Sequence, residues 1–552
     1  MMVPSPERIL FLIIGSGFLL IAAGTSDAQA SPSQNPPTIR ATTRLVEINV
    51  VVHDKKGVPV TGLTREDFTI LDGLKEEKVA TFSVESRRAP KGSSEPLPPN
   101  VFSNRVAREG VTPTSVVVIL LDAAGTTFWD LAYARQQVIK FLSQLQPQDR
   151  VALYVLGREL HIVQDFTTDP APLIEAIRAN GVRASATAAM TMSGEVLSKP
   201  PALSGRAALA AARLDAGLSA MSISRDIARQ WLRLTVLDAL QAIAWHLSGL
   251  PGRKSLLWVT GSVPFPQSPY PGTTDPLGPK VRETLRLLNQ ADVALYPVDA
   301  RGLFVDPRFN AENREMDAGG SGLQQMNLQI QGMIYHAAET GGRAFYNTND
   351  LKTALRTALD DSELTYTLGY YPTHGQWDGK YRPIKVRVNR EGMDVRCRKG
   401  YFATTEEPPV EDAVAILKEA ALNPLDATSV GLTVRARPLG AAGDGVEVAV
   451  NVDAKDLTFR PTKGLWSVQF DTWLGQYTNS GASLEGISKG TSADLKPGTY
   501  QKIMAEGGVS LTFKEKIKPG AQELRVVVRD GSSGSIGSVR IPLEKLLSQS
   551  AP

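Results

Sequence analysis

The spacing of hydrophobic and polar positions changes along the chain, and each change predicts a different kind of structure. Near the N-terminus, apolar and polar residues alternate in TRLVEINVVV at 43–52, which predicts half-buried strands. Between residues 113 and 350, short continuous apolar runs are separated by stretches whose apolar residues recur at helical spacing. From residue 428 onward the period-2 alternation returns. We therefore expect a central α/β unit with β-rich units on both sides.

The central unit is predicted to be a doubly wound α/β domain with a mostly parallel sheet. Its first strand, VVVILLD, ends at Asp122 and leads into a helix at 128–145. Segments 151–157 and 160–166 predict a hairpin, and apolar strands at 255–260 and 293–298 follow amphipathic helices. Strands without alternation, separated by such helices, are typical of a sheet covered on both faces.

Changes in pattern and Pro-rich or Gly-rich stretches place the boundaries between segments. In order, we predict a signal peptide (1–30), a linker (31–40), a small β domain (41–88), a linker (89–112), the α/β domain (113–350, with a flexible insertion at 184–224), a helix plus antiparallel β appendage (351–403), a linker with a short helix (404–427) and a β-sandwich (428–550). The insertion is rich in Ala, Ser and Met, and it is either a disordered surface loop or a lid that binds a partner.

The N-terminus has the three parts of a secretory signal. Arg8 precedes the apolar run 9–24, and Ala28-Gln29-Ala30 follows as a small-residue cleavage site. We expect cleavage after Ala30, with an uncleaved N-terminal anchor as the alternative. No later stretch has the length and apolarity of a transmembrane helix. The mature chain is thus predicted to be secreted or periplasmic.

Composition excludes several classes of partner and chemistry. The net charge of +3 is spread over 552 residues, so the sequence shows no cluster of basic residues of the kind that binds nucleic acid. The single cysteine, Cys397, lies in a strand pattern and is expected to be a small packed apolar residue. No glycine-rich phosphate loop follows any strand, so we expect no nucleotide. The five histidines are scattered without the spacing of a zinc site.

Several stretches carry a resemblance to a known family: VVVILLDAAGTTF, QPQDRVALYVLGRELHIVQDFT and LPGRKSLLWVTGSVPF. With the alternation of strands and helices, they resemble the von Willebrand factor type A family. The flanking stretches TGGRAFYNTNDLKTAL and DGKYRPIKVRVNREGMDVRCRKGYFA look like the secreted A-domain-related proteins of Acidobacteria. The resemblance implies an A-type, Rossmann-like domain at residues 113–350.

The resemblance also implies where a metal-ion-dependent adhesion site would lie. In that family an Asp-x-Ser-x-Ser motif follows the first strand, and a Thr and an Asp from two later loops complete it. Here Asp122 matches the first Asp, Ala124 and Thr126 stand in the two Ser positions, and Gly261 stands in place of the later Asp. The second-loop Thr has only weak candidates, which are Thr235, Thr187 and Thr191.

We therefore predict a degenerate site in which only Asp122 and Thr126 supply side-chain oxygens. Such a site would bind Mg²⁺ or Mn²⁺ weakly if at all, because hard divalent ions need several oxygen ligands. The alternative is that Asp122 is a structural carboxylate accepting backbone N–H groups from the first turn of the following helix.

No catalytic residue is predicted. Ser262 ends a strand, but no general base can be placed beside it, and no G-x-S-x-G elbow occurs. We expect a non-enzymatic protein that binds an extracytoplasmic protein partner without a cofactor. The alternatives left open are a metal-dependent adhesion module and an extracellular hydrolase.

Overall fold

The structure is a computed structural model, and it describes residues 44–86, 97–105, 116–146, 149–179, 230–265, 275–303, 321–403, 413–439, 444–479 and 481–548. The predicted signal peptide and the insertion at 184–224 lie outside these residues, as do Thr187 and Thr191. Among the described residues, no helix combines the length and apolarity needed to span a membrane.

The α/β domain is built on a five-stranded sheet in the order β10-β9-β6-β7-β8. Its strands are β6 (Val116–Asp122), β7 (Val151–Leu156), β8 (Leu160–Thr167), β9 (Lys254–Thr260) and β10 (Val293–Asp299). All neighbouring pairs are parallel except β7–β8, which form the predicted hairpin. Where a further strand was expected at 343–346, a single parallel bridge joins Phe345 to Val298 of β10. The prediction of a mixed α/β chain with a sheet of parallel strands is thus confirmed.

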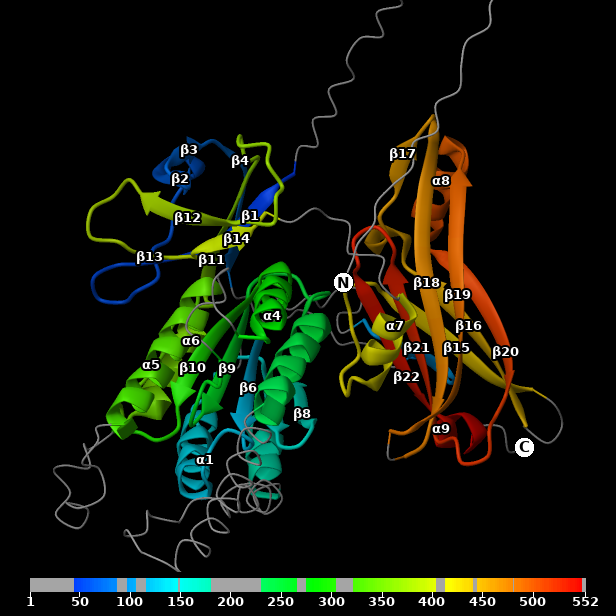
Figure 1. Cartoon of the computed structure of the whole chain (residues 1–552), viewed down its shortest axis with the longest axis horizontal. Coiled ribbons are helices and arrows are strands. Elements are labelled where there is room, and N and C mark those ends of the chain that lie inside the picture. Colours follow the sequence, from blue (N-terminus) through cyan, green and yellow to red (C-terminus); the bar gives the residue numbers. More distant parts are fainter. Residues whose placement is uncertain are drawn as a thin grey trace, which may run out of the picture. The chain divides into compact units, whose positions relative to one another are not determined.

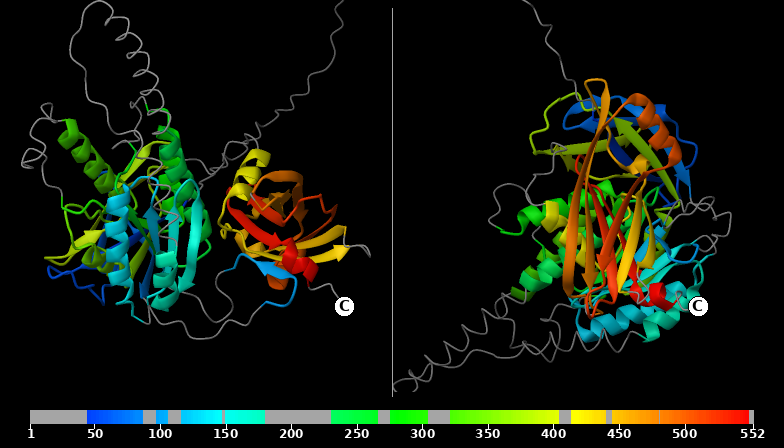
Figure 2. Two further views of the ribbon diagram at one scale, coloured as in Figure 1. Left: turned by 90° about the horizontal axis from the view of Figure 1, so that it is seen from below. Right: turned by 90° about the vertical axis from the view of Figure 1, so that its right-hand side faces the viewer.

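Helices cover both faces of this sheet (Figures 1 and 2). One face carries α1 (Phe128–Leu142), α6 (Leu351–Asp360) and the helix at 170–179; the other carries α4 (Gly278–Gln290), α5 (Ser321–Glu339) and the helix at 230–247. Side chains from alternate positions of each strand enter opposite core clusters, as Val118 and Leu120 do on one face and Val117 and Ile119 on the other. Two-sided burial explains why the strands show no alternation of apolar and polar residues.

The N-terminal β segment does not form a domain by itself. We predicted a small β domain at residues 41–88 and a separate appendage at 351–403. Their strands instead share two four-stranded sheets, β13-β1-β11-β4 and β14-β12-β2-β3. The first segment provides β1 (Val46–His53), the 3-10 turn η1 (Arg65–Asp67), β2 (Phe68–Asp72), β3 (Lys75–Glu77) and β4 (Val79–Ser86); the second provides β11 (Leu364–Tyr370), β12 (Tyr381–Val388), β13 (Asp394–Arg396) and β14 (Gly400–Phe402). We call this composite structure the β unit. Within one segment only β2 pairs with β3 and β12 with β14, and an isolated pair of strands is marginally stable, so each segment needs the other to complete its sheets.

The C-terminal region contains two antiparallel sheets around one core cluster. One is ordered β20-β16-β15-β5 and the other β17-β18-β21-β22, with β19 paired to β18. Their elements are β5 (Val101–Ser103), α7 (Ala413–Leu422), β15 (Leu432–Leu439), β16 (Gly445–Val452), η4 (Ala454–Asp456), β17 (Arg460–Thr462), β18 (Leu465–Tyr477), β19 (Ser483–Leu495), α8 (Pro497–Glu506), β20 (Val509–Lys516), β21 (Glu523–Asp530), β22 (Ile536–Pro542) and α9 (Leu543–Ser548).

Strand β5 lies within residues 89–112, which the sequence predicted to be a linker. It pairs with β15, and the Asn104 side chain next to it donates to the carbonyl oxygens of Ala427 and Val430 at 2.6 and 2.8 Å. A three-residue strand is too short to produce a recognisable alternation, so the Pro- and Ser-rich surroundings dominated the prediction.

One close approach in the α/β domain gives a test of the packing between α5 and β10. A Cβ added to Gly342, which follows α5, would lie 1.9 Å from the carbonyl oxygen of Leu295. Because that neighbour is backbone, Gly342→Ala should lower the free energy of unfolding by about 1–3 kcal/mol, measured by denaturant titration. Gly498→Ala in α8, where a Cβ would meet nothing within 4 Å, is the matched control and should be neutral or slightly stabilising. Equal effects of the two substitutions would contradict this packing.

Candidate functional site

The carboxyl ends of β6 and β9 meet at the point where the chain order in the sheet reverses. β6 is the first strand of the sheet in sequence; β7 and β8 extend it on one side, and β9 and β10 on the other. Leu121 of β6 is paired with Val259 of β9, so the next residues, Asp122 and Thr260, end their strands side by side. This is the topological switch point, where open α/β sheets bind ligands.

At this position the Asp122 carboxyl group is enclosed by its own fold. Its side chain is fully buried. Oδ1 accepts the backbone N–H of Gly125 at 2.8 Å, and Oδ2 lies 3.2 Å from Trp258 Nε1 and 2.8 Å from the Thr260 hydroxyl. Gly125 is required here, because a Cβ at this residue would lie 2.7 Å from Asp122 Oδ2. The carboxyl group therefore connects two strands and the loop that follows the first.

The hydrogen-bond pattern around Thr260 bears on the protonation state of Asp122. The Thr260 Oγ1 atom is 2.8 Å from both Asp122 Oδ2 and the Ser262 carbonyl oxygen, but a hydroxyl has one proton to donate. A protonated Asp122 can donate to Thr260, which then donates to Ser262, so both contacts are satisfied. Burial, the largest influence, raises the pKa of Asp122 and favours this neutral form.

Thr126 and Gly261 lie in contact with each other next to Asp122. Thr126 is buried, and its hydroxyl oxygen accepts the backbone N–H of Gly261 at 2.8 Å. A Cβ on Gly261 would lie 3.1 Å from the Gly125 carbonyl oxygen and 3.2 Å from the Thr126 Cα. The position at which the resemblance implied an Asp therefore has little room for any side chain. Ala124 belongs to the core cluster on one face of the sheet.

The side-chain oxygens of Asp122 and Thr126 do not form a set of ligands that fits a divalent ion. Asp122 and Thr126 are buried, and their side-chain oxygens are engaged in internal hydrogen bonds. Mg²⁺ requires about six oxygen ligands, and Mn²⁺ prefers similar oxygen donors. Within the described ranges, no group of three or more His, Cys, Asp or Glu side chains is arranged to hold a metal. Thr235 lies in the helix at 230–247 and is not a hydrogen-bond partner of Asp122.

As a structural carboxyl group, Asp122 was expected to accept N–H groups from the first turn of the following helix, but its observed hydrogen-bond partners are different. Helix α1 is capped by Thr127, whose hydroxyl accepts the Asp130 N–H at 3.3 Å, and not by Asp122. Trp258 and Thr260, two of the partners of Asp122, were not identified from the sequence. They lie in a continuous apolar run, where nothing in the pattern distinguishes a side chain that binds a neighbouring carboxyl group.

Two further polar residues at this end of the sheet are also satisfied internally. Asp299, the last residue of β10, forms a two-pronged ion pair with Arg301, at 2.8 Å for each contact. Ser262 Oγ lies 3.3 Å from the Gly125 carbonyl oxygen. The backbone of Ser262 is bonded to the Thr260 hydroxyl, whose oxygen accepts the Ser262 N–H at 3.2 Å.

Large apolar side chains remain exposed around the same end of the sheet, which we call the rim. Trp129 in the first turn of α1 is 76% exposed, Trp231 at the start of the helix at 230–247 is 45% exposed, and Leu303 after β10 is 57% exposed. Asn349 connects two of these segments, since it accepts the Tyr133 hydroxyl at 2.6 Å and the Leu303 N–H at 2.8 Å. The rim thus presents aromatic surface around a closed polar centre.

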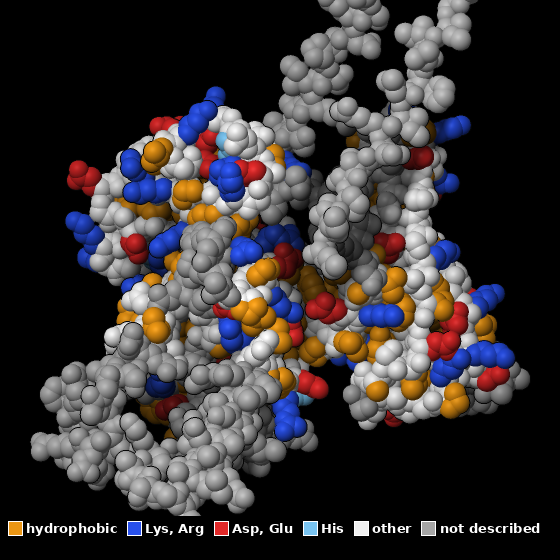
Figure 3. Space-filling model, viewed as in Figure 1, with side chains coloured by type: hydrophobic (Ala, Val, Ile, Leu, Met, Phe, Trp, Pro, Cys, Tyr) orange, Lys and Arg blue, Asp and Glu red, His pale blue; other side chains and the backbone are white. Residues whose placement is uncertain are grey.

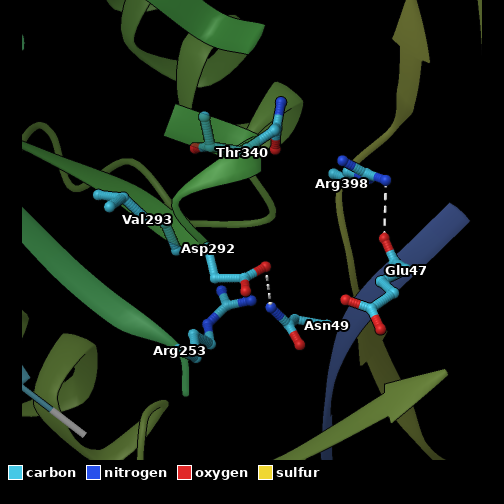
Figure 4. Close-up of a pocket in the computed structure, with 9 residues that line it drawn as sticks. Glu47, Asn49, Arg253, Asp292, Val293, Thr340 and Arg398 are labelled. Atoms are coloured by element: carbon cyan, nitrogen blue, oxygen red, sulfur yellow. Dashed lines mark hydrogen bonds between the residues drawn. The ribbon is translucent and has the colours of Figure 1, made fainter. Parts of the chain in front are cut away.

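A polar pocket lies at the opposite end of the sheet, where β9 and β10 begin (Figure 4). Asn49 of β1 donates to Asp292 at 2.6 Å, Arg398 donates to the Glu47 carbonyl oxygen at 2.7 Å, and Arg253 donates to the Gly341 carbonyl oxygen at 2.6 Å. The two cationic side chains that line the pocket are matched by two carboxylates, Glu47 and Asp292. The Asn49–Asp292 bond joins the β unit to the α/β domain, and residues of both line the pocket, so we assign the pocket to their joint.

Burial also shifts the titration of charged groups at this joint. Burial lowers the pKa of Lys254, the first residue of β9, to about 8, although Asp292 and Glu85 partly offset it. Burial raises the pKa of Asp292 in spite of the nearby Lys254, Arg398 and Arg253.

Over the face of the molecule shown in Figure 3, acidic and basic side chains are interspersed, and no patch of one sign suggests a polyanionic partner.

The sequence matches no protein-family model and none of the curated proteins with which it was compared. Among solved structures it is similar to a von Willebrand factor type A protein from Catenulispora acidiphila (8% identity, 86% of this chain and 76% of that chain, TM-score 0.21). It is also similar to BatB from Bacteroides thetaiotaomicron (12% identity, 45% of this chain and 97% of that chain, TM-score 0.24). A third similar structure contains three N-terminal domains of the type V pili tip protein Mfa5 from Porphyromonas gingivalis (9% identity, 84% of this chain and 77% of that chain, TM-score 0.22). TM-scores this low do not establish membership of a family.

Removing the Asp122 carboxyl group tests its role as a connector of strands. Asp122→Ala would leave the Gly125 N–H and the Trp258 Nε1–H buried without their acceptor. We expect the free energy of unfolding to fall by about 2–4 kcal/mol, measured by denaturant titration. The control is Asp444→Ala, which removes an exposed carboxylate. A loss no larger than that of the control would show that Asp122 does not stabilise the fold.

Proposed function

We propose that this chain is a secreted, non-enzymatic protein-binding protein of the von Willebrand A type, and that it binds its partner through the rim without a metal ion. The sequence motifs around Asp122 and the doubly wound arrangement of strands and helices support the A-type assignment. The n-region, apolar run and cleavage motif of residues 1–30 support export from the cytoplasm. The partner is an extracytoplasmic protein.

The observation that carries this proposal is the contrast between the centre of the rim and its border. At the centre, Asp122 is buried, and internal hydrogen bonds engage both of its oxygens. At the border, Trp129 and Trp231 are exposed. Tryptophan is enriched among the residues that dominate protein–protein binding energy, whereas a metal-mediated contact would need accessible oxygens. A surface of this kind favours recognition through shape and apolar contact.

The alternative of an extracellular hydrolase has less support. Ser262 is the one serine that the sequence places at a strand end of this rim, and its Oγ contacts a backbone carbonyl group. An activated serine needs a base within hydrogen-bond reach. The partners described for Ser262 include Thr260 and Gly125 but no such base.

A metal-dependent adhesion module is the second candidate, because Asp122 ends β6 and Thr126 lies in the loop that follows it, the order that the resemblance implies for a metal site. Isothermal titration of Mg²⁺ and Mn²⁺ into the wild-type chain and into Asp122→Ala separates the two proposals. We expect no difference in heat, because a buried and hydrogen-bonded carboxyl group is not free to coordinate an ion. Saturable heat in the wild type that disappears in Asp122→Ala would instead establish metal-dependent binding.

The proposed binding surface is tested by capture from the native envelope with the immobilised chain. Trp129→Ala should weaken capture of the specific partner about 30-fold or more, since anchor residues of this type contribute at least about 2 kcal/mol. Leu74→Ala, which removes an exposed apolar side chain from the β unit, is the control and should leave capture unchanged. Capture should also persist in a chelator of divalent ions. Capture that survives Trp129→Ala, or that requires Mg²⁺ or Mn²⁺, would contradict the proposal.

A further inference from the structure

A buried histidine lies where the β unit meets the α/β domain. His53 is the last residue of β1 and is 4% exposed. In the sheet it is paired with Asp394 of β13. It also lies 3.6 Å from Asp361, which directly follows α6 of the α/β domain. Three segments that are distant in sequence therefore converge on one imidazole ring.

Hydrogen bonding fixes the tautomer of this ring. Arg396 Nη2 lies 2.9 Å from His53 Nδ1, and because a guanidinium group can only donate, Nδ1 must be the acceptor. The proton of the neutral ring is then on Nε2, which faces Asp361 Oδ1 at 3.6 Å. Arg396 cannot easily move away, since its Nη2 also donates to Asp361 Oδ1 at 2.6 Å and its Nη1 pairs with the other oxygen of the same carboxylate.

A second proton on His53 would have no acceptor in this arrangement. It would sit on Nδ1 and point at an arginine N–H, so two donors and two positive charges would face each other. Of the other charged groups near the ring, Arg343 acts in the same direction as Arg396, and Asp361, Asp394 and Asp54 act against it. Burial has the largest effect, and the net result is a His53 pKa below its ordinary value.

We propose that His53 is an acid-sensitive element of the joint between the β unit and the α/β domain: protonation of its Nδ1 displaces Arg396 and opens the contact of β1 with β13 and with Asp361. This role is independent of the rim and of the proposed partner. The sign follows from linkage. Because the pKa of His53 is lowered in the closed joint, the open form binds the extra proton more tightly, and acid favours opening.

The increase in the equilibrium constant for opening that His53 protonation can cause has an upper bound. In the open form, His53 titrates near its ordinary pKa of about 6.5, while in the closed form it stays neutral. The equilibrium constant for opening then rises about 25-fold between pH 7 and pH 5. Buried carboxyl groups at the same joint act in the opposite direction: burial raises the pKa values of Asp292 and Glu339, so their protonation favours the closed form. The contribution of His53 must therefore be isolated by substitution.

Hydrogen exchange of the full chain between pH 7 and pH 5, corrected for the intrinsic exchange rate, measures the opening directly. We expect amides of β1 and β13 to exchange up to about 25-fold faster at pH 5 in the wild type. In His53→Gln, which keeps an acceptor for Arg396 but does not titrate in this range, the acceleration should be absent. His161→Gln removes an exposed histidine from β8 and should behave like the wild type. Equal acceleration in His53→Gln and the wild type would overturn the proposal.

A second measurement does not depend on how well a variant folds. NMR titration of the wild-type imidazole groups should show His53 as the Nε2–H tautomer, with a midpoint below its ordinary value of about 6.5. A His53 midpoint at or above that ordinary value, or an Nδ1–H tautomer at neutral pH, would rule out the arrangement on which the acid response depends.

Discussion

The hydrogen bonds of a single buried carboxyl group determine what the end of the central sheet can do. Asp122 and Thr260 emerge from neighbouring strands at the one position where an open α/β sheet offers a crevice. Their side chains bond to each other, and Gly125 and Trp258 complete the enclosure. The crevice is therefore filled by the protein itself, and binding at this end must use the surrounding surface.

The two ends of the sheet differ in how their polar groups are used. At the rim, polar side chains are satisfied within the α/β domain, and aromatic side chains are left exposed. At the opposite end, charged side chains bond across to the β unit, through Asn49 to Asp292, Arg396 to Asp361 and Tyr381 to Glu339. The surface proposed for recognition and the contacts that couple the structural units are thus separated by the length of the sheet, so a change at the joint need not alter the rim.

Much of the fold could be predicted from the sequence, because burial on two faces leaves a strong pattern. Continuous apolar runs such as VVVILLD identified the parallel strands, and the segment at 128–145 contained α1. The long-range pairing of β1 with β11, and of β5 with β15, could not be predicted, since short strands carry no information about their partners. The candidate site was located through Asp122, Thr126 and Gly261. Its closure was not foreseeable, because it depends on the register that sets Thr260 beside Asp122.

Crystals of the full chain soaked in MnCl₂ and measured at the manganese absorption edge would show whether the switch point is closed to cations. We expect no anomalous peak within coordinating distance, about 2.6 Å or less, of the Asp122 or Thr126 side-chain oxygens. A manganese peak bound by both residues, with Thr260 and Trp258 displaced from the carboxyl group, would contradict this expectation.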